Sequence, residues 1–205
     1  MLIAEAGGGT GMGLVEDRDK WNTRYAEAAT PPARPEPHPL AQRFERRLPA
    51  GRLLDAACGL GRGIACAGPR IETIYAVDLS DVAIATARRL WASDPRIRWI
   101  VADVAALRFP RAFLDMVCAF GFTNWALLKD LERIVAPGGF VLYEGFAERQ
   151  REVNPRLDPA WTATPASLLR LFGHWEVLAC AETESDGPPY RVHLAAVHPR
   201  QVKEA

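Results

Sequence analysis

Residues 53–61 read LLDAACGLG, an apolar run that ends in a carboxylate and passes at once into a turn with two glycines. Further along, a second apolar run at 74–77 ends in another carboxylate, Asp78. Strand, tight turn, helix, strand and acid form the plan of a nucleotide-binding βαβ unit. The sequence therefore predicts an α/β domain with a ligand site at the carboxyl ends of neighbouring strands.

Apolar runs continue along the chain at intervals that suit alternating strands and helices. We expect strands at 52–55, 73–78, 97–101, 114–120 and 139–145, most of them without strict alternation, as is typical of strands buried on both faces. Helices are expected after Gly61, from Asp81 to 92 with Ser80 as its cap, and at 124–135. The segment 136–139, APGG, is expected to end this last helix and turn into the fifth strand.

The end of the chain shows a different pattern. Thr164 followed by Pro165 predicts a capped helix start, and two β-type runs at 175–181 and 192–197 flank a Gly187-Pro188-Pro189 turn. The fold class predicted is α/β: a doubly wound, mostly parallel seven-stranded sheet with helices on both faces and a C-terminal antiparallel hairpin.

The first fifty residues lack strand patterns. A glycine-rich string at 7–13 has no convincing strand before it, so 1–14 is expected to be a flexible tail rather than a phosphate loop. Residues 17–28 predict a helix, 31–39 a proline-rich connector and 40–48 a short helix. We therefore expect one domain over 15–200, in which 15–50 form a helical cap over the ligand site.

Overall composition excludes several classes of protein. Lys plus Arg and Asp plus Glu number 25 each, so no net charge favours nucleic acid or membrane partners. The four cysteines form no C-x-x-C pair and share no metal-like spacing with the four histidines, so we expect no metal site. Without a signal peptide pattern or an apolar window of about 20 residues, the chain is expected in the cytoplasm.

The glycine turn argues against a dinucleotide. A nicotinamide or flavin fingerprint needs a third glycine, G-x-G-x-x-G, and Ile64 or Cys66 stands at that position, depending on the register. Asp55 at the end of the first strand would also repel a pyrophosphate but attract a cation. Gly59 and Gly61 still allow a ligand to approach the backbone closely. These groups suit a phosphate-free, positively charged adenosine, S-adenosylmethionine.

The strand-end acids then have distinct expected roles. Asp78 is placed to accept hydrogen bonds from the ribose hydroxyls, and Asp103, after the third strand, to accept one from the adenine amino group. Leu79 and Val104 would enclose the adenine ring. Each acid also has a structural alternative: Asp55 and Asp103 as turn caps, and Asp78 as the cap of the following helix.

The motifs together resemble those of class I S-adenosylmethionine-dependent methyltransferases. The segments are 53–61, 76–80, 102–103 and 136–139, and the resemblance runs from about residue 18 to the end. It implies a Rossmann-like methyltransferase fold with S-adenosylmethionine as cofactor. Within that superfamily, the W-x-x-R-Y opening at 21–25, the late segment 142–146 and Asn154-Pro155 look like the tellurite-resistance and thiopurine-type branch.

In relatives of that type an N-terminal Trp and Arg help to close the cofactor site. The cofactor-binding residues expected are Trp21, Arg24, Tyr25, Asp55, Ala57, Cys58, Gly59, Gly61, Asp78, Leu79, Asp103, Val104 and Phe120. Ala57 replaces the first glycine of the family's G-x-G-x-G turn.

The acceptor side departs from that branch, because Gly121 and Asn124 stand where an Arg and a His would align. Tellurite or another metalloid is therefore not expected as substrate. The polar groups expected to face an acceptor are Thr123, Asn124, Tyr143 and Glu144. No catalytic base is assigned, and all four histidines (38, 174, 193 and 198) are expected outside the site.

The function predicted is methyl transfer to a small-molecule acceptor by a monomer or homodimer. Two alternatives remain open. One is a non-catalytic protein that binds S-adenosylmethionine or S-adenosylhomocysteine, and the other is a nicotinamide oxidoreductase.

Overall fold

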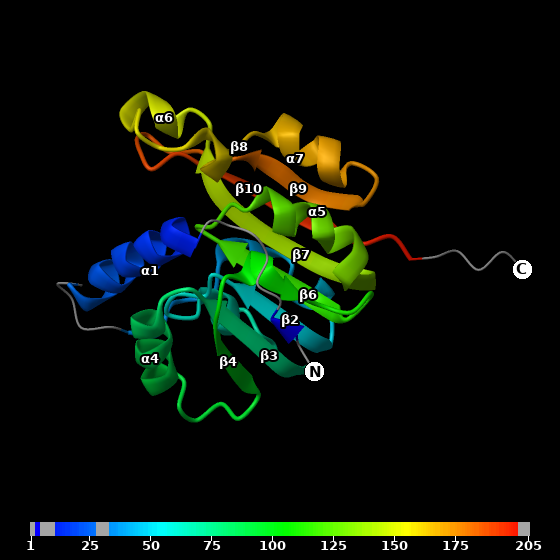
Figure 1. Ribbon diagram of the computed structural model, residues 1–205. Coiled ribbons are helices and arrows are strands. Elements are labelled where there is room, and N and C mark those ends of the chain that lie inside the picture. The colour runs from blue at the N-terminus through cyan, green and yellow to red at the C-terminus, as the bar shows by residue number, and fades with distance from the viewer. Residues whose placement is uncertain (1–2, 5–10, 28–32, 201–205) are drawn as a thin grey trace, which may run out of the picture.

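A single sheet forms the centre of the computed structural model, which describes residues 3–4, 11–27 and 33–200. Its strands run in the order β4-β3-β2-β6-β7-β10-β9, and β8 pairs with one end of β7 (Figure 1). The strands are β2 (Gly51–Ala56), β3 (Ile71–Asp78), β4 (Ile97–Val101), β6 (Leu114–Phe120), β7 (Val135–Ala147), β8 (Thr162–Ala163), β9 (Glu176–Glu182) and β10 (Arg191–Val197).

Strand direction confirms the predicted fold class. The pairs among β4, β3, β2, β6 and β7 are parallel, whereas β10 runs antiparallel to both β7 and β9. The chain places β3 and β4 on one side of β2, and β6 and β7 on the other. The strand order therefore reverses between β2 and β6, and open α/β sheets typically bind ligands at the carboxyl ends of such strands.

Helices cover both faces of the sheet. They are α1 (Gly11–Ala26), α2 (Pro39–Arg43), α3 (Arg62–Ala65), α4 (Asp81–Leu90), α5 (Trp125–Ile134), α6 (Gln150–Val153) and α7 (Pro165–Phe172), with 3-10 turns at Glu45–Arg47, Val104–Ala106 and Pro159–Trp161. Leu54 packs in one core cluster, with α5 and α7, and its neighbour Leu53 in the other, with α2, α3 and α4. Successive side chains of a strand point to opposite faces of the sheet. A strand in which apolar and polar residues do not alternate therefore contributes apolar side chains to both cores.

The predicted helix caps are confirmed. The Ser80 hydroxyl accepts the Ala83 N–H at 3.0 Å, and Thr164 forms a capping box with Ser167. The expected turn at 136–139 differs, because strand β7 begins as early as Val135. Its register against β6 is irregular there, so the glycines lie in a bulge of the strand rather than before it.

The N-terminal region also differs from expectation. Helix α1 begins at Gly11 rather than near 17, and Ile3–Ala4 (β1) pairs antiparallel with Leu107–Arg108 (β5), so these parts of the expected tail are regular structure. The glycines at 7–9 and the end of the predicted first helix, at 28, lie outside the described residues. The short helix predicted at 40–48 is divided into α2 and a 3-10 turn. None of the described helices has the length and apolar character needed to cross a membrane.

Candidate functional site

The glycine turn after β2 is built around Asp55. This carboxylate is 2% exposed and accepts the Ile64 N–H at 3.0 Å, so it holds the start of α3 from inside the turn. A Cβ on Gly63 would collide with it. Burial raises the pKa of Asp55 well above its usual value, and the backbone hydrogen bonds oppose this only partly. Asp55 therefore acts as a cap within the turn, the role expected as its structural alternative.

Backbone conformation in this turn is unusual. Gly59 has φ of 52° and Gly61 of 95°, both in the left-handed region that favours glycine, and Ala57 lies there too at 53°. Cys58 is buried, and burial raises the pKa of its thiol well above the usual value. The conformation of this turn is therefore fixed by left-handed backbone angles together with buried carboxylates that bind its N–H groups.

Asp78, at the end of β3, meets this turn directly. One of its oxygens accepts the Gly59 N–H at 2.8 Å and the other accepts the Ser80 N–H at 2.8 Å. Burial raises the pKa of Asp78, although these hydrogen bonds lower it in part. Because Ser80 rather than Asp78 caps α4, the cap alternative for Asp78 is wrong.

Helix α1 lies against the same turn. The Asn22 amide accepts the Ser80 hydroxyl at 2.6 Å and donates to Asp81 at 2.7 Å, which ties α1 to the start of α4. The Tyr25 hydroxyl sits where a Cβ on Gly59 would be, and burial, followed by the charge of Asp78, raises its pKa. In Figure 1, α1 lies on the side to which the arrowhead of β6 points.

The other two predicted residues of α1 lie beside Tyr25. The Trp21 ring centroid is 6.4 Å from that of Tyr25, and the Arg24 guanidinium lies 5.2 Å from the Trp21 ring. The predicted trio is therefore brought together at the glycine turn.

The third acid is adjacent to the second. The Ala102 N–H donates to the Asp78 carbonyl at 3.0 Å, and Asp103 follows at once. One Asp103 oxygen accepts the Ala105 N–H at 2.9 Å and caps the 3-10 turn. This is the turn-cap role expected as the structural alternative for Asp103, and it uses one of the two carboxylate oxygens. Val104 is buried and Leu79 half-buried close by.

A histidine that sequence reasoning missed lies at the ends of β6 and β7. The His38 ring stacks on Phe120 with centroids 4.2 Å apart, and its Nε2 is 3.0 Å from a Glu144 oxygen. Its Nδ1 accepts the Leu40 N–H at 3.2 Å, which makes Nε2–H the donor to Glu144. The prediction that every histidine lies outside the site is therefore wrong for His38.

The surroundings of Glu144 favour its charged form. Burial alone would raise the pKa of Glu144, but the hydrogen bond from His38 and the charges of Arg191 and Arg62 outweigh burial and lower it. His38 is 5% exposed and lies between two prolines, far from any strand end in the sequence. The one local signal was a histidine at the cap of an apolar helix, which does not indicate a distant carboxylate.

The remaining acceptor-side predictions have mixed outcomes. Tyr143 is fully buried, and its hydroxyl pairs with that of Thr123 at 2.8 Å, so the expectation that Tyr143 faces an acceptor is wrong. Burial raises the pKa of Tyr143 to about 12. Asn124 caps α5 by accepting the Leu127 N–H at 2.9 Å, which gives it a structural role.

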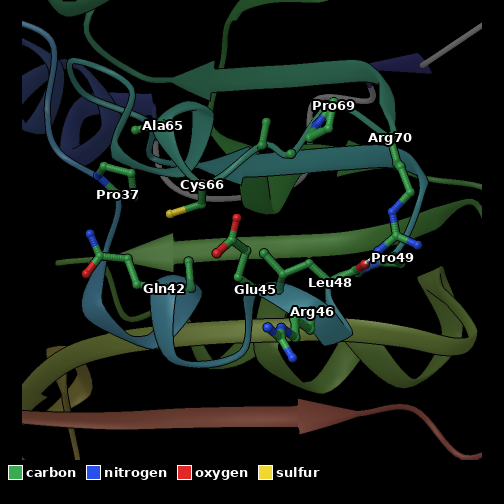
Figure 2. A pocket seen from close by; sticks show the side chains of 13 residues that line it. Pro37, Gln42, Glu45, Arg46, Leu48, Pro49, Ala65, Cys66, Pro69 and Arg70 are labelled. Carbon is green, nitrogen blue, oxygen red and sulfur yellow. Dashed lines mark hydrogen bonds between the residues drawn. The ribbon is translucent and has the colours of Figure 1, made fainter.

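A cavity of about 530 Å³ lies elsewhere, between the 37–49 segment and the 65–70 loop (Figure 2). Figure 2 shows the Cys66 sulfur directed toward its Pro37 and Gln42 side. None of the predicted cofactor-binding residues lines this cavity. The strand-end cluster, and not this cavity, is therefore the candidate site.

Comparison with known proteins gives matches to methyltransferases. Residues 53–139 match the family model described as a methyltransferase domain, the span that contains the glycine turn, Asp78 and Asp103. The chain is 30% identical over 168 residues to the ubiquinone/menaquinone biosynthesis C-methyltransferase UbiE of Coxiella burnetii, covering 76% of this chain and 64% of that protein. It is 31% identical over 131 residues to a malonyl-[acyl-carrier protein] O-methyltransferase of Enterobacter lignolyticus, covering 57% and 47%.

These alignments span about half to two thirds of the length of the relatives. A solved structure with similar architecture is geranyl diphosphate C-methyltransferase from Streptomyces coelicolor, with a TM-score of 0.65 at 14% identity, covering 93% of this chain and all of that one. The relatives do not confirm the tellurite-resistance and thiopurine-type branch. The sheet order and the solved structure agree on a doubly wound α/β fold, and residues 53–139 resemble a methyltransferase domain.

Proposed function

We propose that this protein transfers a methyl group from S-adenosylmethionine to a small-molecule acceptor at the carboxyl ends of β2, β3, β6 and β7. The observation that carries the proposal is the buried Asp78 carboxylate, held against the Gly59 turn and covered by α1. A carboxylate there suits two neighbouring hydroxyls of a ribose. It does not suit a phosphate.

The residues present fit an adenosine-type donor. Asp78 would bind the ribose, the second oxygen of Asp103 would bind the adenine amino group, and Leu79 and Val104 would enclose the ring. Asp55 fills the space beneath the turn and accepts the Ile64 N–H, so that N–H is not free to bind a pyrophosphate. Tyr25 and Trp21, carried by α1, would cover the donor and keep water away.

S-adenosylmethionine supplies a methyl carbon on a positively charged sulfur, which leaves with the bonding electrons as the acceptor forms its new bond. The protein's main contribution to such an in-line displacement is alignment and exclusion of water. Glu144, which is hydrogen-bonded to His38, would lie on the acceptor side and orient an acceptor. The names of the relatives support a small or carrier-bound acceptor rather than a nucleic acid.

The test is binding followed by turnover. Calorimetry with S-adenosylhomocysteine should show binding by the wild type and a loss of about ten- to a hundredfold in affinity for Asp78→Asn, because hydrogen bonds to a charged group contribute about 1.5–3 kcal/mol. Asp186→Asn, at an exposed position, is the matched control. Formation of S-adenosylhomocysteine with a panel of acceptors then separates an enzyme from a non-catalytic binder. Binding of NADH in place of S-adenosylhomocysteine would contradict the proposal.

A further inference from the structure

Arg191 is the first residue of β10 and reaches the acceptor side of the candidate site. It lies opposite Phe146 of β7, and its guanidinium carbon is 4.2 Å from the centroid of that ring. Its Nη1 lies 3.8 Å from the position that a Cβ on Gly121 would occupy. The Gly121 N–H in turn donates to the Glu144 carbonyl at 2.7 Å. One half-buried guanidinium therefore lies at the meeting point of β6, β7 and β10.

The charges around Arg191 are mostly of its own sign. Burial lowers the pKa of the Arg191 guanidinium, Glu144 acts in the opposite direction, and the charges of Arg62 and Arg24 lower it further. Among the described residues, the ion pair of Glu144 is made with His38 rather than with Arg191. Asp55 and Asp78 lie on the glycine turn, on the side of Arg24 and Arg62, whereas the carboxylate that acts on Arg191 is Glu144, which already has a hydrogen-bond donor in His38. A half-buried guanidinium beside a carboxylate that is already engaged favours a ligand that supplies negative charge.

The methyl donor brings one carboxylate, which does not account for all of this positive charge. Arg62 opens α3 directly after Gly61, and Arg24 is next to Tyr25, so both lie by the glycine turn that holds the donor. Arg191 lies on the other side, by Gly121 and Phe146. A donor carboxylate at the glycine turn would face Arg24 and Arg62, and Arg191 would then face the second substrate.

We propose that the methyl acceptor is a carboxylic acid whose carboxylate is bound by Arg191. This inference rests on the proposed function, because it assigns the substrate class of the same site. A guanidinium presents two parallel N–H groups that match the two oxygens of a planar carboxylate. A phosphate dianion fits less well, since its second charge would face the Glu144 carboxylate.

The experiment uses the full chain saturated with S-adenosylhomocysteine, so that donor binding is established first. Benzoate, hexanoate, benzamide and methyl phosphate are then titrated and followed by ligand-observed NMR. The variants are Arg191→Gln, Arg191→Lys and the matched control Arg170→Gln, which changes an exposed arginine of α7. We expect at least one of the two carboxylates to bind about tenfold more tightly than benzamide or methyl phosphate, to lose that preference in Arg191→Gln, and to keep part of it in Arg191→Lys.

Each other outcome has a defined meaning. If S-adenosylhomocysteine itself does not bind the wild type, the proposed function fails before the acceptor is tested. If it binds, the carboxylate proposal is overturned when neither carboxylate is preferred over benzamide, when methyl phosphate is preferred, or when Arg170→Gln has the same effect as Arg191→Gln. If Arg191→Gln lowers the affinity for S-adenosylhomocysteine by more than tenfold, this arginine binds the donor instead, and the proposal is equally overturned.

Discussion

The proposed donor side and the proposed acceptor side of the candidate site are built in different ways. On the donor side, Gly59, Asp78 and Asp103 each lie within or directly after a strand of one continuous βαβ pattern, and backbone groups make most of their contacts. On the acceptor side, His38 and Glu144 meet across a separation of 106 residues, and Arg191 joins them from the last strand. A site for a shared cofactor is therefore encoded locally, whereas a site for a particular substrate is encoded by tertiary contacts.

The largest expected effect comes from the donor turn. Gly59→Ala would place a Cβ against the Tyr25 hydroxyl in a left-handed backbone conformation, so we expect S-adenosylhomocysteine affinity to fall by about a hundredfold or more and stability by about 1–3 kcal/mol. Calorimetry and urea unfolding measure the two effects. Gly68→Ala is the matched control, because a Cβ there meets open space. Equal affinity in both variants would show that the donor does not use this turn.

The pH dependence of donor binding sharpens the comparison. Burial raises the pKa of Asp78, and only its ionised form accepts both ribose hydrogen bonds. Affinity for S-adenosylhomocysteine should therefore hold at neutral pH and fall as pH drops through a value above the usual Asp pKa of about 4, by up to about tenfold per pH unit. Calorimetry at several pH values measures the curve, which should be flat in Asp78→Asn. A wild-type curve without this fall would remove Asp78 from the ribose site.

On the acceptor side we expect turnover, and not donor binding, to change. His38→Phe keeps a ring against Phe120 but removes the hydrogen bond to Glu144. Turnover should fall by about tenfold or more, with S-adenosylhomocysteine affinity within about twofold of wild type. Steady-state kinetics and calorimetry on the same preparation provide the comparison. A parallel loss of donor affinity would mean that the two sides are not separable.

Acid stability should also report on the His38–Glu144 pair. Since the folded-state pKa of Glu144 is lowered, its stabilising contribution is complete above the unfolded-state value of about 4.5 and is lost as pH falls through the lower folded-state value. The difference in unfolding free energy between wild type and Glu144→Gln should therefore shrink below about pH 4.5. Urea titrations at pH 7 and pH 4 test this, and a difference that grows at low pH would contradict it.

The smallest effect is expected at Asn124. Asn124→Ala removes the cap of α5 and should cost about 1 kcal/mol of stability, with little change in donor affinity. Thermal unfolding measures the cost, and Asn124→Ser, which retains a capping oxygen, is the control. If the Ser variant has full stability but no turnover, Asn124 acts on the acceptor as well as on the helix.

The outcome of the sequence predictions follows the same division. The strand positions, the mostly parallel sheet and the C-terminal hairpin follow from patterns that span a few residues each. The extension of β7 through 136–139 does not, because pairing with β6 and β10 overrides the local turn signal. Nothing in the sequence pattern indicated that α1 begins as early as Gly11. The His38–Glu144 contact was not predictable either, since a proline-flanked histidine carries no information about which distant carboxylate it will meet.

The tie between Asn22 and the start of α4 has a kinetic consequence. With the Tyr25 hydroxyl against Gly59, we expect a donor to reach the turn after α1 has shifted relative to α4. Observed association rates for S-adenosylhomocysteine should therefore level off at high ligand concentration, at the rate of that shift. Asn22→Ala should raise the plateau and shorten the residence time of spent cofactor, so one amide side chain would set how fast the protein exchanges its nucleoside.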